Sequence, residues 1–448
     1  MAAQRSRLAK IEVADDGAHT LAQGRSCASA VTLCEARSAE VIRKGAEVVR
    51  AEDLVTPPLL NQDPYSEANL INPYVWQEEL RELAPVVRLE QYKAYAIGRY
   101  AEIKLVLRDP VTYDNAAGIG LADISKPGSW GRKASVFSEK VGEEHARNRR
   151  VLTRIMSPIV IRRWKSDFER QATETLDEIG DKQKVDGVQD IAEAFILKAL
   201  PGAVGLTMTR EQMNVAADLN FNQLGPNNDL LAAALRRAEP HMEWYNKQMT
   251  RDALVPGGVG AKIYDAVDQG LIPAEVAPEM IRAFLRAGMD STISSISGAL
   301  RYLALDREQW DALRVDPGKA RAAFEEATRL ESPVSISYRT TSREADLSGY
   351  AVPAGSKVAL WFGSANRDPR KWEKPDMFDL DRNTIGHLGF GDGPHVCIGQ
   401  NIARMEGEVI LATMAKRFRK IELNGEPTRK VVNALHALKS LPLRLVPA

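Results

Sequence analysis

The side chain in this sequence that is best suited to take part in a reaction is Cys397. It follows a loop that contains Gly389, Gly391 and Gly393, where a left-handed backbone costs little. Gly399 and a segment of good helix propensity come directly after it, which places Cys397 near the start of a predicted helix. Backbone N–H groups and the positive end of a helix dipole favour thiolate, so a lowered pKa is expected for this thiol. A lone cysteine is more often a small buried apolar residue, and only its surroundings decide between the two interpretations.

A second segment whose side chains could take part in a reaction is the run Ala287-Gly288-Met289-Asp290-Ser291-Thr292. It lies in a long segment after Pro278 whose apolar residues recur at helical spacing, which predicts one long helix through the core. These apolar residues are Ile281, Phe284, Leu285, Met289, Ile293 and Ile296. Hydroxyl groups inside a helix tend to bond the carbonyl one turn earlier, so a polar kink without chemical function is the alternative interpretation.

Two further groups of charged residues are uninformative when taken alone. Glu326 and Arg329 are three residues apart, which is a common side-chain pair on helices. The segment EEHARNRR contains His145 and Arg149, and a run of charges like this usually forms a solvated helix face.

Taken together, these residues resemble one known family. Phe390, Gly393, Cys397, Gly399 and Ala403 match the cytochrome P-450 signature at every required spacing. The pair Glu326 and Arg329 lies about 70 residues earlier, as in that family. The chain resembles the bacterial soluble cytochromes P-450 over about residues 57–448. The resemblance implies a mainly α fold with a small β-rich part, in which haem b lies between the long central helix and the cysteine-loop helix.

The resemblance also implies roles for individual residues. Cys397 is expected to be the axial thiolate ligand of the iron, and a thiolate favours O–O cleavage. The haem-binding residues implied by the family pattern are His145, Arg149, Arg339, His395, Phe390, Gly399, Ala287 and Gly288. The basic residues among them are expected to pair with the haem propionates, because carboxylates are not buried without partners. Glu326 and Arg329 are implied to hold the haem-binding core.

The chain departs from the family at two positions. Asp290 and Ser291 are expected to pass protons to bound oxygen, with Thr292 as a possible substitute, but serine stands where threonine is usual. Serine keeps the hydroxyl and lacks the methyl group that restricts its rotamer. Met377 stands where family members often have an arginine that joins Glu326 and Arg329, and Arg382 is a candidate replacement.

The substrate is expected to be a small aromatic molecule, because the chain is similar to bacterial enzymes that remove O-methyl groups from para-substituted benzoates. Those enzymes hold a carboxylate with arginine and hydroxyl groups, whereas residues 114–121 here contain neither arginine nor serine. An unpaired buried carboxylate is costly, which favours a neutral guaiacol or 4-alkylguaiacol over 4-methoxybenzoate. Arg286 is either an anchor for an anionic substrate or a helical partner of Asp290. The candidate substrate residues are Phe221, Leu224, Phe284, Ala287 and Ile336.

Two other functions remain open at the sequence level. A peroxygenase would use hydrogen peroxide directly, and a haem sensor would bind a ligand without turnover; the acid–hydroxyl pair at Asp290 and Ser291 argues against both. For a monooxygenase, the resemblance implies electrons from NAD(P)H through a separate ferredoxin and ferredoxin reductase. Arg147, Arg150 and Arg404 are candidates for contact with an acidic donor.

The elements that must position these residues are mostly helices. Helices are predicted over residues 144–180, interrupted near Pro158, and over residues 229–251, in addition to the long helix after Pro278. Strands are predicted at Ala94–Ile97, Ser337–Thr341, Lys357–Trp361 and Leu443–Val446. Residues 1–50 show little apolar periodicity and are expected to be a loosely ordered extension, with a single domain over residues 51–448.

Composition narrows the remaining classes of function. The 60 basic and 60 acidic residues give a formal net charge of zero, which does not favour nucleic acid or an anionic membrane as a partner. The cysteines are few and odd in number, so we expect no disulfide framework and a reducing cytoplasmic location. The sequence contains no apolar run near the roughly 20 residues of a membrane span.

Overall fold

The computed structural model describes residues 42–44, 47–49, 54–126 and 134–448. The chain divides into two compact units, Met1–Glu52 and Asp53–Ala448. In the first unit the described backbone is an antiparallel pair of strands, β1 (Ile42–Lys44) and β2 (Glu47–Val49). The remainder of the predicted extension, with Cys27 and Cys34, lies outside the described residues.

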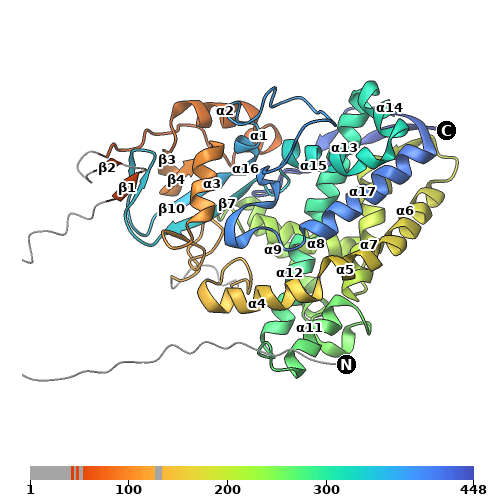
Figure 1. The fold of residues 1–448 in the computed structure, drawn as a ribbon, viewed down its shortest axis with the longest axis horizontal. Coiled ribbons are helices and arrows are strands. Elements are labelled where there is room, and N and C mark those ends of the chain that lie inside the picture. Colours follow the sequence, from red (N-terminus) through yellow and green to blue (C-terminus); the bar gives the residue numbers. More distant parts are fainter. Residues whose placement is uncertain (1–41, 45–46, 50–53, 127–133) are drawn as a thin grey trace, which may run out of the picture. The chain divides into compact units, whose positions relative to one another are not determined.

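Helices dominate the second unit, as the sequence predicts (Figure 1). Before the central helical segment the α-helices are α1 (Glu67–Ile71), α2 (Tyr74–Leu83), α3 (Tyr100–Arg108), α4 (Gly142–Ile155), α5 (Pro158–Arg163), α6 (Lys165–Ile179), α7 (Ala194–Val204), α8 (Arg210–Asn222), α9 (Asp229–Ala238), α10 (Met242–Lys247) and α11 (Val259–Asp268). From there onward they are α12 (Val276–Ala287), α13 (Asp290–Leu305), α14 (Arg307–Val315), α15 (Ala320–Glu331), α16 (Phe362–Ala365) and α17 (Gln400–Arg417).

Two of the predicted helices are interrupted where proline occurs. Pro158 opens α5 at its first position, so the predicted interruption is confirmed. The helix predicted over residues 229–251 is wrong as one continuous element. Helix α9 ends at Ala238, and a 3₁₀ turn that contains Pro240 precedes α10, because proline has no N–H to continue an α-helix.

The long central helix is also two helices rather than one. Helix α12 ends at Ala287 and α13 begins at Asp290, with Gly288 and Met289 between them. The hydroxyls of Ser291 and Thr292 donate to the carbonyls of Ala287 and Gly288, at 2.7 and 3.0 Å. Glycine is a poor helix former, and these side-chain bonds compete with backbone bonds, which accounts for the break.

The strands form one main sheet and several small ones. They are β3 (Val87–Leu89), β4 (Ala94–Ile97), β5 (Tyr113–Asp114), β6 (Lys184–Asp186), β7 (Ile336–Thr341), β8 (Ala345–Leu347), β9 (Tyr350–Val352), β10 (Lys357–Trp361), β11 (Phe418–Leu423), β12 (Thr428–Arg429), β13 (Leu438–Ser440) and β14 (Pro442–Pro447). The five-stranded sheet has the order β3-β4-β10-β7-β5, with β10 parallel to β4 and antiparallel to β7. All four predicted strands are confirmed within one residue at each end.

The largest apolar core lies among α6, α7, α12, α13, α15 and α17. In this core α15 packs closely on α17, since a Cβ added at Gly407 would lie 2.0 Å from the ring of Phe324. Figure 1 shows α13, α15 and α17 together on the helical side of the second unit, with the five-stranded sheet on the other side. Within the described residues, no helix combines the length and apolar character that a membrane crossing requires.

Candidate active site

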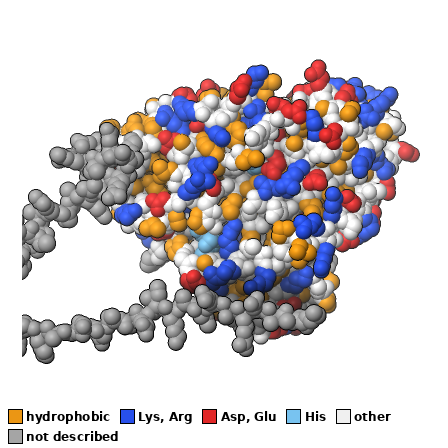
Figure 2. Space-filling view, viewed as in Figure 1, with side chains coloured by type: hydrophobic (Ala, Val, Ile, Leu, Met, Phe, Trp, Pro, Cys, Tyr) orange, Lys and Arg blue, Asp and Glu red, His pale blue; other side chains and the backbone are white. Residues whose placement is uncertain are grey.

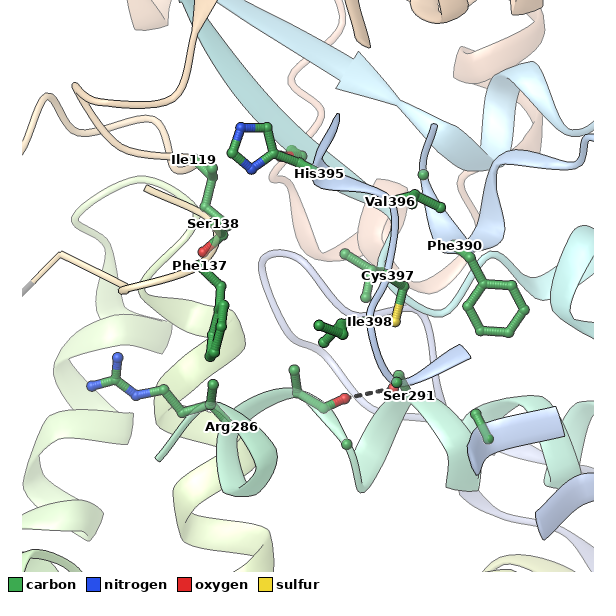
Figure 3. A pocket seen from close by; sticks show the side chains of 18 of the residues that line it. Ile119, Phe137, Ser138, Arg286, Ser291, Phe390, His395, Val396, Cys397 and Ile398 are labelled. Carbon is green, nitrogen blue, oxygen red and sulfur yellow. Dashed lines mark hydrogen bonds between the residues drawn. The ribbon is translucent and has the colours of Figure 1, made fainter. Parts of the chain in front are cut away.

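Cys397 lies in a loop that a dense set of backbone contacts fixes in place. Its N–H donates to the carbonyl of Phe390 at 2.8 Å, and α17 begins three residues later at Gln400. Gly393 has φ +70°, and a Cβ there would lie 2.2 Å from the carbonyl oxygen of Leu107 at the end of α3. Only glycine fits this approach. Figure 3 shows the sulfur of Cys397 directed toward the start of α13, which carries Ser291.

The electrostatic surroundings of Cys397 differ from the sequence expectation. The side chain is exposed, but it faces a protein-lined cavity rather than bulk solvent. Burial among protein atoms raises the pKa of the thiol, and the N–H groups of Gly399 and Gln400 oppose this only in part. The predicted lowering of the thiol pKa is therefore wrong for the polypeptide alone. The helix start and the nearby arginines act in the predicted direction, and desolvation outweighs them.

The wall opposite Cys397 is the break between α12 and α13. Ala287, Gly288, Ser291 and Thr292 all line the cavity. Space at the break is tight, because a Cβ at Gly288 would lie 2.7 Å from the side chain of Leu200. This wall therefore presents hydroxyl groups and little side-chain bulk to the cavity.

Asp290 does not face the main cavity. Its carboxyl group lies in a second cavity, where Oδ1 is 3.7 Å from Nζ of Lys430. Burial raises the pKa of this carboxyl group, and Lys430 acts in the opposite direction. The alternative pairing of Asp290 with Arg286 does not occur, since Arg286 lines the main cavity.

Four predicted basic residues gather at one end of the main cavity. Arg339 is 5% exposed, and burial lowers its pKa to about 10. The rings of His145 and His395 lie 4.1 Å apart, and Arg149 lines the same region. Within the described part of the chain, none of the four forms a salt bridge with an acidic residue.

This basic cluster fits the propionates of a haem group. Nδ1 of His395 is buried and has no hydrogen-bond partner among the described residues, and burial, with the charges of neighbouring basic groups, lowers the pKa of His395 to about 3. Burial also lowers the pKa of Arg149 and of His145. Cations without partners in a desolvated site are costly, and two carboxylates would offset that cost. The residues present therefore fit an anionic cofactor next to Cys397.

The predicted structural pair is fully buried and has a third partner. Arg329 donates to both carboxylate oxygens of Glu326 at 2.8 Å, and both side chains are inaccessible to solvent. Nε of Arg382 also donates to Glu326 Oε1 at 2.8 Å. Met377 contributes its backbone carbonyl, which accepts a bond from Arg329 at 3.3 Å. Arg382 thus supplies the second guanidinium partner of Glu326, which family members often provide from the position that Met377 occupies here.

Four of the five candidate substrate residues line the main cavity, namely Phe221, Leu224, Phe284 and Ala287. Ile336 does not, and it packs instead in a separate apolar core. Successive strand residues face opposite sides, so Ser337 and Arg339 of β7 point into the cavity while Ile336 points away from it. Phe390, Gly399 and the haem-side residues of the prediction also line the cavity.

Several cavity residues were not identified from the sequence. Ile119, Phe137 and Ser138 come from loops and lie on the side of the cavity reached by Arg286 (Figure 3). Glu406 of α17 is the most unusual, because it is fully buried and neither of its carboxyl oxygens has a hydrogen-bond partner among the residues that the structure describes. Burial raises its pKa well above the ordinary value. A glutamate three residues before the apolar run of α17 carries no sequence signal of burial.

Comparison with known proteins gives the same class of protein as this geometry. A thiol under a cavity, hydroxyls opposite it and cations at one end define a haem-thiolate oxygenase site. The chain is 42% identical over 393 residues to cytochrome P450 CYP199A2 of Rhodopseudomonas palustris, covering 87% of this chain and 95% of that protein. It is 31% identical over 345 residues to putative cytochrome P450 126 of Mycobacterium tuberculosis, covering 73% and 82%.

A family model described as cytochrome P450 matches residues 320–444 of this chain. A crystal structure of P450BioI with an acyl-carrier protein ligated to hexadec-9Z-enoic acid has the same fold, with a TM-score of 0.74 and 23% identity over 84% of this chain and 100% of that chain. The chain belongs to the cytochrome P450 family. It is a monooxygenase that uses a haem iron with a cysteine thiolate ligand and receives electrons from external redox partners.

Proposed function

We propose that this monooxygenase removes the O-methyl group of a small methoxyphenol of the guaiacol or 4-alkylguaiacol type. The observation that carries the proposal is the apolar surface of the main cavity. Ile119, Phe137, Phe221, Leu224 and Phe284 line the same cavity as Cys397 and the α12–α13 break. Apolar walls with few polar groups suit a small neutral aromatic molecule.

We assign the haem to specific residues of this cavity. Cys397 is the thiolate ligand, while Arg339, His395, His145 and Arg149 hold the propionates. The haem, when bound, supplies the reduction of dioxygen and the transfer of one oxygen atom. Negative charge at the propionates would raise the pKa of both histidines and stabilise the basic cluster.

The remaining steps belong to the protein's own side chains. The hydroxyls of Ser291 and Thr292 lie in the cavity wall and are placed to carry protons, with Asp290 as the acid behind them. The aromatic walls hold the substrate so that its methoxy carbon is the atom nearest the oxygen-binding position. Insertion of oxygen into a C–H bond of that carbon gives a hemiacetal, which breaks down to a phenol and formaldehyde.

A second candidate substrate, a 4-methoxybenzoate, is favoured by Arg286. This residue lines the cavity on the same side as Phe137 (Figure 3), and no acidic residue in the described part of the chain lies within salt-bridge distance of it. It interacts with the hydroxyl of the buried Tyr245, which leaves its remaining donors available for a carboxylate.

We also propose a ferredoxin, itself reduced by a ferredoxin reductase and NAD(P)H, as the electron donor. Among the candidate arginines, Arg150 is well exposed and, within the described residues, pairs only with the exposed Glu143, whereas Arg404 is largely buried and ion-paired with Glu325. Arg150 is therefore the better candidate, and Arg404 belongs to the internal structure of the cysteine-loop region.

The decisive experiment is a titration of the ferric, haem-loaded protein with guaiacol, 4-methylguaiacol and 4-methoxybenzoate, followed through the Soret band. A low- to high-spin shift and formaldehyde release with the guaiacols alone support the proposal. A shift with 4-methoxybenzoate alone that is lost in Arg286→Met and kept in Arg286→Lys would replace the neutral substrate with the anionic one. Formaldehyde release with hydrogen peroxide alone, at the rate of the complete system, would indicate a peroxygenase, and spin shifts without product would indicate a sensor.

Two controls test the haem assignment independently of substrate. The reduced protein under carbon monoxide should show the red-shifted thiolate band, and Cys397→Ser should lose it. A chain that begins at Asp53 should give the same band as the full chain, because we propose that residues 1–50 are an accessory extension to a domain over residues 51–448.

A further inference from the structure

A second cavity lies next to the start of α13, on the side opposite the main cavity's hydroxyl wall. It is formed by the π-helical turn Gly187–Glu193, by α8, α9 and α13, and by the β12–β13 hairpin. Its charged side chains are both acidic and basic, and they include Glu193, Asp290 and Lys430. Asp290 belongs to this cavity while its neighbour Ser291 belongs to the main one, so the first turn of α13 forms part of the wall between them.

Within this cavity, charged groups are ordered from the interior to the surface. Asp290 and Glu193 are both 4% exposed, and one amine lies between them, since Nζ of Lys430 is 3.7 Å from Asp290 and 4.0 Å from Glu193. Nε of Arg210, an exposed residue, is 3.7 Å from Glu193 on the outer side. Two buried acids thus share one lysine, and one of them reaches toward solvent.

The spacing of these groups leaves room for water. Each of the three distances exceeds that of a direct hydrogen bond, and Oδ1 of Asp290 has no hydrogen-bond partner in the described part of the chain. Polar groups separated in this way in a cavity that reaches the surface are commonly bridged by water molecules. Burial raises the pKa of both carboxyl groups, and Lys430 opposes the shift at each; Asp218 adds to it at Asp290.

Lys430 is held in place by its neighbours in the hairpin. Its N–H donates to the carbonyl of Ala437 at 3.0 Å. The preceding residue, Arg429, donates to the buried Glu331 at 2.7 Å, and Glu331 also lies 3.3 Å from His436. A lysine at the end of such a fixed segment has less freedom to leave Asp290 than one on an open loop.

We propose that Lys430 and Glu193 are positioning residues for oxygen activation, forming with Asp290 a water-bridged proton path from the second cavity to the α13 wall beside Ser291. Lys430 keeps Asp290 ionised and directed into the second cavity between proton transfers. Glu193 takes up a proton from solvent and passes it through bridging water to Asp290. Only O–H bonds break and form along this path, and no electrons move. The inference depends on the monooxygenase activity of the family and not on the proposed substrate.

The first test measures the ionisation of Asp290 in the haem-loaded protein without substrate. The infrared C=O stretch of protonated carboxyl groups is followed against pH, and the band absent from Asp290→Asn is assigned to Asp290. In Lys430→Met the midpoint of this band should move to higher pH, and Lys430→Arg should restore it. Lys439→Met is the matched control, because Lys439 lines the same cavity, is exposed, and forms no salt bridge within the described residues. Equal midpoints in Lys430→Met and Lys439→Met would overturn the proposal.

The second test measures proton delivery during turnover with guaiacol and with 4-methoxybenzoate. Lys430→Met and Glu193→Gln should each release several-fold more hydrogen peroxide per NAD(P)H and show a larger solvent deuterium isotope effect than Lys439→Met. Unchanged peroxide release and isotope effect in both variants overturn the relay, even if the infrared midpoint moves. If neither compound is turned over by the wild-type protein, the proposed substrates fail and the infrared result alone decides the role of Lys430.

Discussion

At the scale of single residues, the structure separates buried charges that are paired from those that are not. Glu326 is inaccessible to solvent and accepts bonds from Arg329 and Arg382 on both carboxylate oxygens. Glu406 is equally buried and accepts none from the described residues. Burial raises the pKa of Glu406 well above its ordinary value and so favours its neutral form, whereas Glu326 is held between two guanidinium groups.

The ionic centre gives the first prediction. Glu326→Gln leaves the buried Arg329 and the partly buried Arg382 without their anionic partner, and the free energy of unfolding should fall by about 3–5 kcal/mol. Denaturant unfolding of the haem-loaded protein measures the change. Arg307→Gln, which breaks the exposed pair with Asp311, is the control and should leave the unfolding midpoint almost unchanged. Similar midpoints for the two variants would show that the buried centre contributes no more than a surface pair.

At the scale of elements, the cysteine loop depends on its close contact with α3. Gly393 approaches the carbonyl of Leu107 so closely that no side chain fits, while Gly391 has a similar positive φ and no atom within 4 Å of an added Cβ. Comparing a substitution at each glycine therefore separates the effect of backbone strain from the effect of the contact with Leu107.

We expect Gly391→Ala to cost about 1 kcal/mol from left-handed strain alone. Gly393→Ala carries the same strain and must also displace α3 from the loop, so it should reduce the haem content of the purified protein and the thiolate band far more. Haem content per chain and the carbon monoxide spectrum are the measurements. If both variants behave alike, the contact with Leu107 does not determine the shape of the loop.

The same elements show what the sequence can and cannot predict. Local signals worked for strands such as Ala94–Ile97 and for Cys397, whose loop is a contiguous pattern of glycines. They failed at the central helix, because the hydroxyls of Ser291 and Thr292 donate to carbonyls of the preceding turn. These hydrogen bonds form only in the folded helix, so the spacing of apolar residues does not reveal them. They also failed for Ile336 and Glu406. Which side of a strand or helix faces a cavity is decided by packing between segments far apart in the chain.

At the scale of the whole described molecule, a few ionic contacts connect distant segments around the site. Glu325 of α15 lies 2.8 Å from Nε2 of His387, in the loop before the cysteine segment, and it also pairs with Arg404 of α17. Burial alone would raise the pKa of Glu325, but the hydrogen bonds from His387 and Arg404 outweigh it and lower the pKa to about 2. One carboxylate thus joins two helices and a loop.

This carboxylate predicts how stability depends on pH. The folded-state pKa of Glu325 lies below its ordinary value of about 4.5, so its contribution is complete above pH 4.5 and is lost as pH falls toward 2. Unfolding free energies measured between pH 5.5 and about 3.5 should fall less steeply in Glu325→Gln than in the wild-type protein. Parallel slopes for the two proteins would show that Glu325 does not titrate differently in the folded state.

The contact between Arg382 and Glu326 has a consequence for how such proteins are found and redesigned. A search pattern that requires arginine at position 377 would reject this chain, although the same charge reaches the same carboxylate from five residues further along. A pattern written in terms of which atoms meet would accept it. When variants of this protein are designed, positions 377 and 382 therefore have to be chosen together, because restoring arginine at 377 would place a second guanidinium beside a carboxylate that is already fully paired.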